Sequence, residues 1–307
     1  MELIRGLDQL KPHHQPSVAS IGNYDGVHLG HQQVIKTLLT KCQELEAPST
    51  VITFEPLAKE FFAPESVTRL SSIEDRANRL FELGVDRVLV IEFDADFASY
   101  TPNGFIQDVL VQGLGVKYLC VGDDFRFGKN REGDFSMLLE AGALFGFDVM
   151  AHDTFELDGN RVSSGRVRDA LGQNDFDLAA RLLGRRFAIS GEVTKGRQLG
   201  RTIDFPTANI PLPGIKAPIA GVFAVIATHT EYGTLNGVAN VGNRPTVNGQ
   251  ENRLEVHLFD FDADLYGQQL QVEFHSKIRD EIKFDSFDLL TQQIKLDAAK
   301  AKAVLGI

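Results

Sequence analysis

Short apolar segments alternate with longer segments of helical periodicity from the start of the chain to about residue 185. The segments typical of strands are residues 18–21, 49–54, 87–92, 118–121 and 148–152. The segments with helical periodicity are residues 32–45, 73–83, 102–114, 137–145 and 165–183. This alternation predicts an α/β domain, over residues 1–184, in which helices cover a parallel sheet.

The pattern changes after Arg185 to short strands separated by glycine and proline. These strand-like segments are residues 187–195, 221–228, 235–241, 253–259 and 269–276, and residues 286–305 return to a helical period. Such a pattern is typical of an antiparallel barrel or sandwich. We therefore expect a second domain over residues 185–307, with a C-terminal helix packed on the β structure.

Composition limits the partners of this 307-residue chain. Its residues are 43% hydrophobic and 24% charged, as in ordinary globular proteins, and its net charge of −11 opposes nonspecific binding to nucleic acid or anionic lipid. Cys42 and Cys120 stand alone, and the sequence carries neither an export signal nor an apolar run of bilayer length. We expect a cytoplasmic monomer or weak oligomer that binds neither nucleic acid nor membrane.

The turn after the first predicted strand has the sequence GNYDGVHLGH, from Gly22 to His31. Glycines allow backbone amides to approach a ligand, and the helix N-terminus that follows favours anions. His28 and His31 are three residues apart and can face one anion. A P-loop lysine is absent, and two histidines without paired cysteines make a poor zinc site. The turn predicts a phosphate site, although a simple glycine turn with two surface histidines stays possible.

Two further segments suggest contacts to a nucleotide. Residues 122–133, GDDFRFGKNREG, follow the fourth predicted strand, and their aspartates could hold a ribose or magnesium while their basic residues neutralise phosphate. The alternative is a solvated charged loop. Ser163, Ser164 and Arg166 begin the last helical segment of this domain. Serines are common helix caps, but an arginine in the first turn opposes the helix dipole unless an anion binds there.

The sharpest pattern of the second domain is GRQLGR, from Gly196 to Arg201, followed by FPTAN. Thr207 and Asn209 are two apart on an extended segment, so their oxygens face one side and could bind magnesium; hydrogen bonds to the backbone are the alternative. In the predicted strand 253–259, alternation places Glu255 and His257 on the face opposite the aliphatic residues.

These motifs resemble known families. GNYDGVHLGH, Phe54-Glu55-Pro56, GDDFRFG and SSGRVR are similar to the FAD synthetase module of bacterial bifunctional riboflavin kinase/FAD synthetases, a member of the nucleotidyltransferase superfamily. PTAN, residues 237–246, LEVHLFDF and IRDE resemble the riboflavin kinase family. The resemblance covers both domains. It implies a Rossmann-like nucleotidyltransferase domain and a kinase β-barrel, which would convert riboflavin to FMN and then FMN to FAD with ATP and Mg²⁺.

The resemblance also implies residue roles. Glu255 would be the kinase base, and Thr207 and Asn209 would bind the metal. His28, His31 and Arg166 would serve adenylyl transfer. The residues implied to bind ATP are Gly22, Asn23, Asp25, Gly26, Gly30, Asp123, Arg126, Ser163, Ser164, Gly196 and Arg201. Those implied to bind flavin are Phe54, Phe62, Phe125 and Arg279.

The chain departs from the family pattern at several positions. Leu57-Ala58 stand where His-Pro is usual, Tyr24 replaces phenylalanine, Gly165 replaces threonine, Asp204 replaces glycine and Asn243 replaces threonine. Asp204 adds a negative charge near the expected metal and phosphates. Two other functions stay open: a flavin-binding regulator with decayed sites, and a nucleotidyltransferase carrying a nucleic-acid-binding barrel. The intact histidines, Glu255, Thr207 and Asn209 favour an enzyme, and the acidity of the chain opposes nucleic acid.

Overall fold

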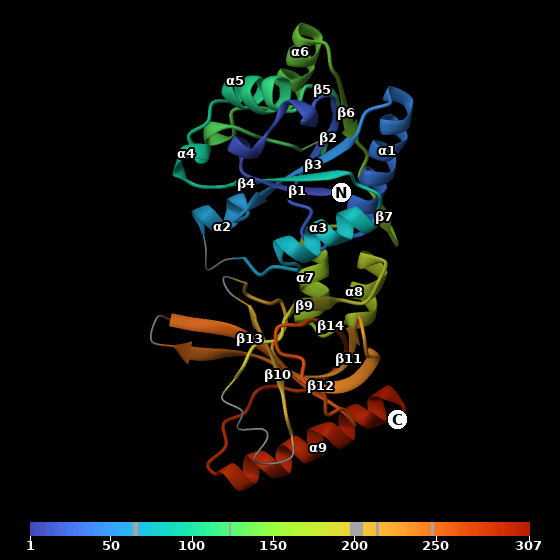
Figure 1. Ribbon diagram of the computed structural model, residues 1–307, viewed down its shortest axis with the longest axis vertical. Coiled ribbons are helices and arrows are strands. Elements are labelled where there is room, and N and C mark those ends of the chain that lie inside the picture. Colours follow the sequence, from blue (N-terminus) through green and yellow to red (C-terminus); the bar gives the residue numbers. More distant parts are fainter. Residues whose placement is uncertain (64–66, 123, 197–204, 213–214, 247–248) are drawn as a thin grey trace. The chain divides into compact units, whose positions relative to one another are not determined.

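The computed structural model describes residues 1–63, 67–122, 124–196, 205–212, 215–246 and 249–307. Its contacts divide the chain into two compact units. The first unit contains Met1–Val67 and Ile73–Ser163, and the second contains Thr68–Ser72 and Ser164–Ile307. Figure 1 shows an α/β arrangement in the first unit and a curved β-sheet in the second.

A six-stranded sheet forms the centre of the first unit, and all its pairs are parallel. The strand order is β1-β4-β3-β2-β5-β6. The strands are β1 (Glu2–Arg5), β2 (Ser17–Ile21), β3 (Ser49–Glu55), β4 (Arg87–Glu92), β5 (Val116–Gly122) and β6 (Asp148–His152). The prediction of a parallel sheet is confirmed. Because the chain winds outward in both directions from β2 and β5, the carboxyl ends of these two strands mark the topological switch point, where such folds bind ligands.

Helices cover the sheet, and apolar side chains from sheet and helices form two core clusters. The helices are α1 (Leu29–Leu45), α2 (Ala58–Phe62), α3 (Ile73–Glu82), α4 (Ala95–Ala98), α5 (Pro102–Gly104), the π-helix η4 (Phe105–Gly113) and α6 (Phe135–Phe145). Val34, Ile35 and Leu38 of α1 are buried, as their helical spacing predicts.

The structure corrects several predictions for individual elements. No prediction covers β1, α2, α4 or the small hairpin of β7 (Glu156–Leu157) and β8 (Asn160–Arg161), which are too short to show a clear period. The helix predicted over residues 102–114 changes from α to π at Phe105. The single helix predicted over residues 165–183 is two helices, α7 (Ser164–Gly172) and α8 (Phe176–Leu183). Asn174 adopts a positive φ there, and the Asp175 side chain caps α8 by accepting from the Leu178 N–H.

The second unit is built on a six-stranded antiparallel sheet in the order β10-β13-β12-β11-β14-β9. The strands are β9 (Ala188–Glu192), β10 (Ala208–Leu212), β11 (Gly221–His229), β12 (Gly233–Thr246), β13 (Gly249–Leu258) and β14 (Gln269–Arg279). The sheet almost closes on itself, because the Thr194 N–H beyond β9 donates to the Asn209 carbonyl of β10 at 2.8 Å. The barrel prediction is confirmed; β10 was not predicted as a strand.

Helix α9 (Phe287–Leu305) packs along one face of this barrel (Figure 1). Ala298 and Ala301 of α9 lie against Val222, Ala224 and Val238 of the sheet. The Ser286 hydroxyl caps the helix by accepting from the Leu289 N–H, which explains why the helical pattern begins at this position.

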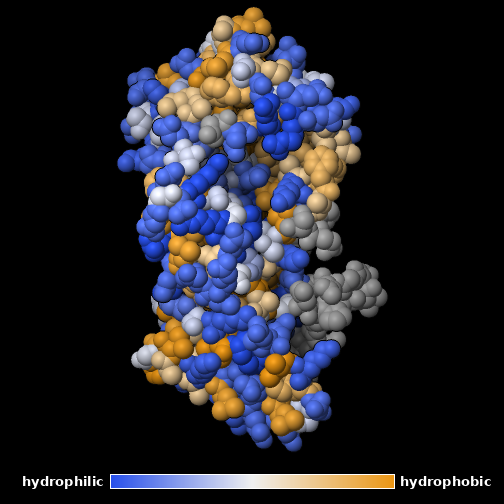
Figure 2. All heavy atoms as spheres, turned by 180° about the vertical axis from the view of Figure 1, so that it is seen from behind, coloured by the Kyte–Doolittle hydropathy of each residue, from blue (hydrophilic) through white to orange (hydrophobic). Residues whose placement is uncertain are grey.

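Helices α7 and α8 belong to the second unit, so the contacts divide the chain before the boundary predicted at residue 184. Phe176 of α8 contacts the Phe223 ring of β11 with centroids 5.8 Å apart. Figure 2 shows hydrophobic patches lying between hydrophilic residues on the surface. Among the described residues, none of the helices combines the length and apolar character needed to cross a membrane.

Candidate active sites

The glycine-rich turn between β2 and α1 is compact and largely buried. Tyr24, Asp25 and Val27 are at most 2% exposed, and the Tyr24 hydroxyl lies 2.6 Å from the Ser20 hydroxyl. Gly26 adopts a φ of 79°, a conformation that glycine reaches without steric cost. The turn thus brings Gly22 and Asn23 to the carboxyl end of β2, beside the strand β5.

His28 is the N-cap residue of α1, and its Nδ1 accepts a hydrogen bond from the His31 N–H at 3.3 Å. This acceptor role leaves the proton of the neutral ring on Nε2, which can donate to an anion. The His28 and His31 rings stack with centroids 3.6 Å apart. Gly30 leaves room for the His28 ring, because a Cβ at position 30 would stand about 3.1 Å from that ring. The structural role of a cap and the predicted role in anion binding are therefore compatible.

Burial lowers the pKa of His31 well below its ordinary value, and His28, His152 and Arg76 lower it further. The His31 ring is therefore neutral near pH 7. Its buried Nδ1 has no hydrogen-bond partner among the described residues. Arg76 is fully buried and donates to the Thr53 hydroxyl, 3.1 Å away, at the end of β3. An arriving phosphate would meet polar groups that are already held in place.

A pocket of about 1020 Å³ opens beside Gly22 and Asn23 in the first unit. Its aromatic lining consists of Phe54, Phe61, Phe62, Phe93, Phe97, Tyr100, Phe105, Phe125 and Phe127. The Phe125 and Phe127 rings are stacked at 5.6 Å, and Phe62 is 71% exposed. A planar aromatic ligand that carries phosphate fits this combination of rings and glycine turn. Phe54, Phe62 and Phe125, predicted from the sequence to contact flavin, all line the pocket.

Basic side chains from the loop after β5 line the same pocket, namely Arg126, Lys129 and Arg131. Arg126 lies 3.3 Å from Asp134, and both side chains are partly exposed. This loop and the glycine turn follow the adjacent strands β5 and β2, so the sheet brings together two motifs that are about 100 residues apart in sequence. Asp123 lies outside the described residues.

Ser163 ends the first unit, and Ser164 begins helix α7 in the second. Arg166 is half-buried in the first turn of α7, where the sequence places it. Three residues of α7 are buried, Val167, Ala170 and Leu171.

Three polar residues on neighbouring strands lie in a row in the barrel. Glu255 of β13 pairs directly with Asn209 of β10 on one side and with Asn240 of β12 on the other. Directly paired residues project from the same face of a sheet. Leu254 and Val256 are fully buried, whereas Glu255 is half-buried, so the alternation predicted for this strand is confirmed.

Asn209 is held firmly beside Thr207. Its Nδ2 donates to the Thr207 carbonyl at 3.1 Å, its own carbonyl accepts from Thr194, and it is 6% exposed. Part of the alternative reading, a hydrogen bond to the backbone, is therefore present. This bond fixes the amide so that Oδ1 is the atom available to a cation, and such a neutral oxygen suits Mg²⁺. Gly196 packs on the amide: a Cβ there would stand 2.6 Å from Nδ2.

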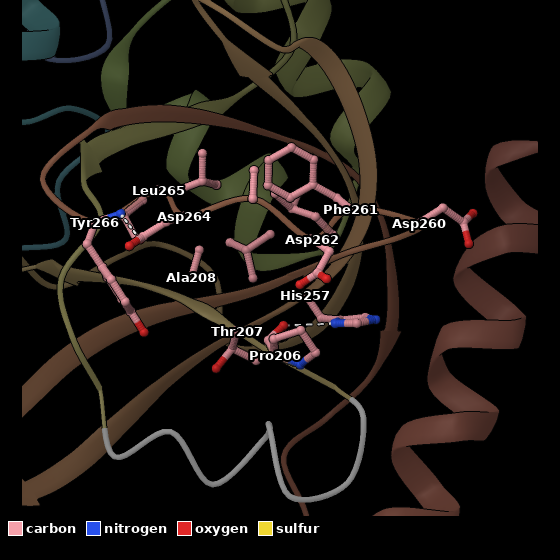
Figure 3. Close-up of a pocket in the computed structure, with 14 residues that line it drawn as sticks. Pro206, Thr207, Ala208, His257, Asp260, Phe261, Asp262, Asp264, Leu265 and Tyr266 are labelled. Carbon is pink, nitrogen blue, oxygen red and sulfur yellow. Dashed lines mark hydrogen bonds between the residues drawn. The ribbon is translucent and has the colours of Figure 1, made fainter.

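A pocket of about 780 Å³ adjoins Thr207 in the barrel (Figure 3). Pro206, Thr207 and Ala208 form one wall, and the loop from Asp260 to Tyr266 forms another. His257 lies between them, and its Nδ1 is 2.9 Å from the Pro206 carbonyl, as the dashed line in Figure 3 shows. Arg201 and Asp204 lie outside the described residues, and the description does not extend to the Asn243 side chain.

Arg279, predicted to contact flavin, makes a two-pronged ion pair with Asp297 of α9. Its Nε and Nη2 donate to the carboxylate at 2.7–3.0 Å, and Asp297 is 4% exposed. Its Nη1 donates to the Asp280 carbonyl at 2.8 Å. The guanidinium thus joins the end of β14 to α9. Its predicted role toward flavin stays a prediction.

One group near the chain start has the composition of a metal site: Glu2, His13 and His14 offer ligand atoms within 4.8 Å of one another. The Lys11 N–H donates to His14 Nδ1 at 2.9 Å, so the proton of the neutral ring is on Nε2, the atom that faces Glu2. A histidine that binds metal normally donates from its other nitrogen. These three residues therefore form a hydrogen-bonded cluster rather than a metal centre.

Several residues that line these sites were not predicted from the sequence. Phe61, Phe93 and Phe97 line the aromatic pocket, and Arg76 and His152 act on His31. They come from α2, α3, α4 and the ends of β4 and β6, where no motif marks them. Phe93 follows β4 directly and His152 ends β6, so a position at a strand end marks only these two.

Comparison with known proteins matches the two parts of the chain to two different families. Residues 10–166 match the family model described as FAD synthetase, and residues 183–305 match the one described as riboflavin kinase. The bifunctional riboflavin kinase/FMN adenylyltransferase of Pseudomonas fluorescens is 47% identical over 99% of this chain and 98% of its own. The Escherichia coli K12 protein of the same name is 46% identical over 100% and 99%. A Streptococcus pneumoniae crystal structure titled macrolide-efflux protein shares the fold, with 28% identity, a TM-score of 0.75 and coverage of 96% and 97%.

The fold and the two sites define a protein that combines a nucleotidyltransferase-like α/β unit with a flavokinase barrel. This chain belongs to the bifunctional riboflavin kinase/FMN adenylyltransferase family.

Proposed function

We propose that this chain phosphorylates riboflavin to FMN in the barrel and transfers AMP from a second ATP to FMN in the first unit. The products are FAD and pyrophosphate. One observation carries each half of the proposal. In the barrel, it is the direct pairing of Glu255 with Asn209. In the first unit, it is the aromatic pocket that opens beside the glycine turn.

In the kinase reaction, the riboflavin 5′-oxygen attacks the γ-phosphorus of ATP, the bond to the ADP oxygen breaks, and Glu255 accepts the hydroxyl proton. Its half-buried position next to Asn209 supports this role, because the carboxylate would then lie beside a proposed metal ligand. Thr207 and Asn209 would hold Mg²⁺, which when bound neutralises charge on the ATP phosphates. A positioned base contributes about 10²–10⁴-fold, and alignment supplies much of the rest.

In the adenylyl transfer, an FMN phosphate oxygen attacks the α-phosphorus of ATP, and pyrophosphate leaves. No covalent intermediate on the protein is required. His28 and His31 donate hydrogen bonds to the phosphates from rings that stack on each other, while Gly22, Asn23, Asp25, Gly26 and Gly30 shape the turn around them. We also assign Arg166, Ser163 and Ser164 to ATP in this step, together with Asp123 and Arg126. The aromatic pocket, including Phe54, Phe62 and Phe125, would receive the isoalloxazine ring.

The first test is to incubate the protein with riboflavin, ATP and Mg²⁺ and to separate the flavins by chromatography. We expect FMN to form first and FAD to follow. Formation of neither flavin would end the proposal, and formation of FMN alone would reject the adenylyltransferase half.

Two substitutions separate the reactions. Glu255→Gln should lower the rate of FMN formation by about 10²-fold or more and leave the conversion of FMN to FAD intact. His28→Ala should do the reverse. Because His28 also caps α1, His28→Asn is the matched variant: asparagine retains the cap but not the imidazole. His28→Asn should therefore be as stable as the parent and still fail in adenylyl transfer. Damage to both reactions by each variant would refute the division of labour.

A further inference from the structure

His257 lies next to the proposed metal site but supplies none of its ligands. It is two residues from Glu255 on the same face of β13, and Figure 3 shows its ring between the Asp260–Tyr266 loop and Pro206. Its ring also contacts the Phe205 ring, with centroids 4.6 Å apart, and the Phe259 ring at 5.8 Å.

The hydrogen bond to Pro206 fixes the state of the histidine. A carbonyl oxygen can only accept, so His257 Nδ1 carries the proton and donates it to the Pro206 carbonyl at 2.9 Å. Proline has no N–H with which to join the ladder, and β10 begins only at Ala208. The backbone just before Thr207 is therefore held by a side chain, at a place where strand pairing does not hold it.

The two proposed metal ligands are fixed from different sides. Thr194 and the Asn209 amide hold the backbone at Asn209 and Thr207, and His257 holds the carbonyl of Pro206. We infer that His257 is a positioning residue that sets the Thr207 hydroxyl for Mg²⁺ binding in the kinase reaction. The inference rests on the proposed function, because it requires Thr207 to be a metal ligand.

A pair of substitutions separates the hydrogen bond from the packing of the ring. His257→Phe keeps an aromatic ring between Phe205 and Phe259 but removes the donor. His257→Asn removes the ring, yet its Nδ2 occupies a position equivalent to Nδ1. A hydrogen bond of this kind contributes about 0.5–1.5 kcal/mol. We expect His257→Phe to raise the Mg²⁺ concentration for half-maximal kinase rate by about 2- to 10-fold, with little change in kcat at saturating Mg²⁺. His257→Asn should stay close to the parent.

Hydrogen exchange of the ligand-free protein gives a second measurement that does not depend on turnover. Peptides covering residues 205–210 should exchange faster in His257→Phe than in His257→Asn. His229 provides a matched control, because it is a buried barrel histidine whose Nδ1 accepts from Glu231 and Tyr232, outside the pocket. His229→Phe should leave the Mg²⁺ requirement unchanged, and all three variants should keep the adenylyltransferase activity.

Each outcome has a stated meaning. An unchanged Mg²⁺ requirement in His257→Phe, or an equal loss in His257→Phe and His257→Asn, would overturn the positioning role. A fall in kcat that saturating Mg²⁺ does not restore would also overturn it. Thr207→Ala tests whether Thr207 binds the metal. If this variant leaves the Mg²⁺ requirement unchanged, the proposed metal ligand is wrong. If it raises the Mg²⁺ requirement and His257→Phe does not, only the role of His257 is rejected.

Discussion

Single residues in both units combine a structural contact with a position in a site. His28 caps α1, and we propose that its ring also binds an anion. Asn209 bonds the Thr207 backbone and stands beside Glu255. A sequence pattern can suggest either role, and for the serines and asparagines of turns the structural role is the commoner. The contacts show the structural role of each side chain, and the proposed binding role would use a second polar atom of the same side chain.

Gly196 gives a prediction at this scale. A methyl group there would crowd the Asn209 amide, which Thr194 and the β10–β13 ladder prevent from moving away. Overpacking of this kind costs about 1–3 kcal/mol, so Gly196→Ala should weaken the kinase response to Mg²⁺ by about fivefold or more. Steady-state kinetics at varied Mg²⁺ measure it. Gly172→Ala is the control, because a Cβ at that position meets no atom within 4 Å. Equal kinetics of the two variants would contradict the packing argument.

At the scale of elements, α9 is attached to β14 by a buried ion pair and by a hydrogen bond from Lys300. The Asp297 carboxylate accepts from Nε and Nη2 of Arg279 and from Gln293, and Lys300 donates to the Ile278 carbonyl nearby. The small residues Ala298 and Ala301 allow the helix to approach the sheet closely. The helical period of residues 286–305 predicts the helix, but the strand on which it packs depends on strand pairing across the barrel.

Asp297→Asn should therefore destabilise the second unit by about 3 kcal/mol, because it leaves a largely buried guanidinium without its charge partner. Urea unfolding followed by circular dichroism measures this loss. Asp280→Asn serves as the comparison: Asp280 is exposed and pairs with Lys277, so its loss should cost less than about 1 kcal/mol. If Asp297→Asn leaves the stability unchanged but raises the KM for riboflavin, Arg279 acts on flavin rather than on α9.

For the whole molecule, charge and burial together predict sensitivity to acid. Burial lowers the pKa of three histidines, His31, His257 and His275, below their ordinary value of 6.5. Below about pH 6.5 the unfolded chain takes up protons at these rings while the native protein does not. The free energy of unfolding therefore rises as the pH increases toward 6.5, and the contribution of these three histidines to it is complete above that pH. Each ring contributes a slope of up to about 1.4 kcal/mol per pH unit.

We expect the melting temperature of the protein to fall as the pH is lowered from 7.5 to 5. His31→Phe preserves a ring against His28 and Tyr24 but cannot take up a proton, so the unfolding of its first unit should depend less on pH. Calorimetry between pH 5 and 7.5 checks both, and an equal decline in His31→Phe and the parent would refute the argument.

Most of the regular elements and all the motifs follow from the sequence by itself, because periodicity and turn chemistry are local. The strands β4 and β6 have their predicted bounds, and the glycine turn and the loop after β5 follow strands as expected. The cytoplasmic location, the weak or absent oligomerisation and the lack of nucleic acid stay predictions from composition and charge.

Only the tertiary structure decided which distant residues meet. Asn209 and Glu255 become neighbours through strand pairing, His257 reaches Pro206 across 51 residues, and α7 joins the second unit rather than the first. The rings of the aromatic pocket come from separate helices and strand ends. The physical reason is that a local pattern fixes the type of an element and its buried face, whereas register, burial of polar groups and strand order depend on which partners complete the core.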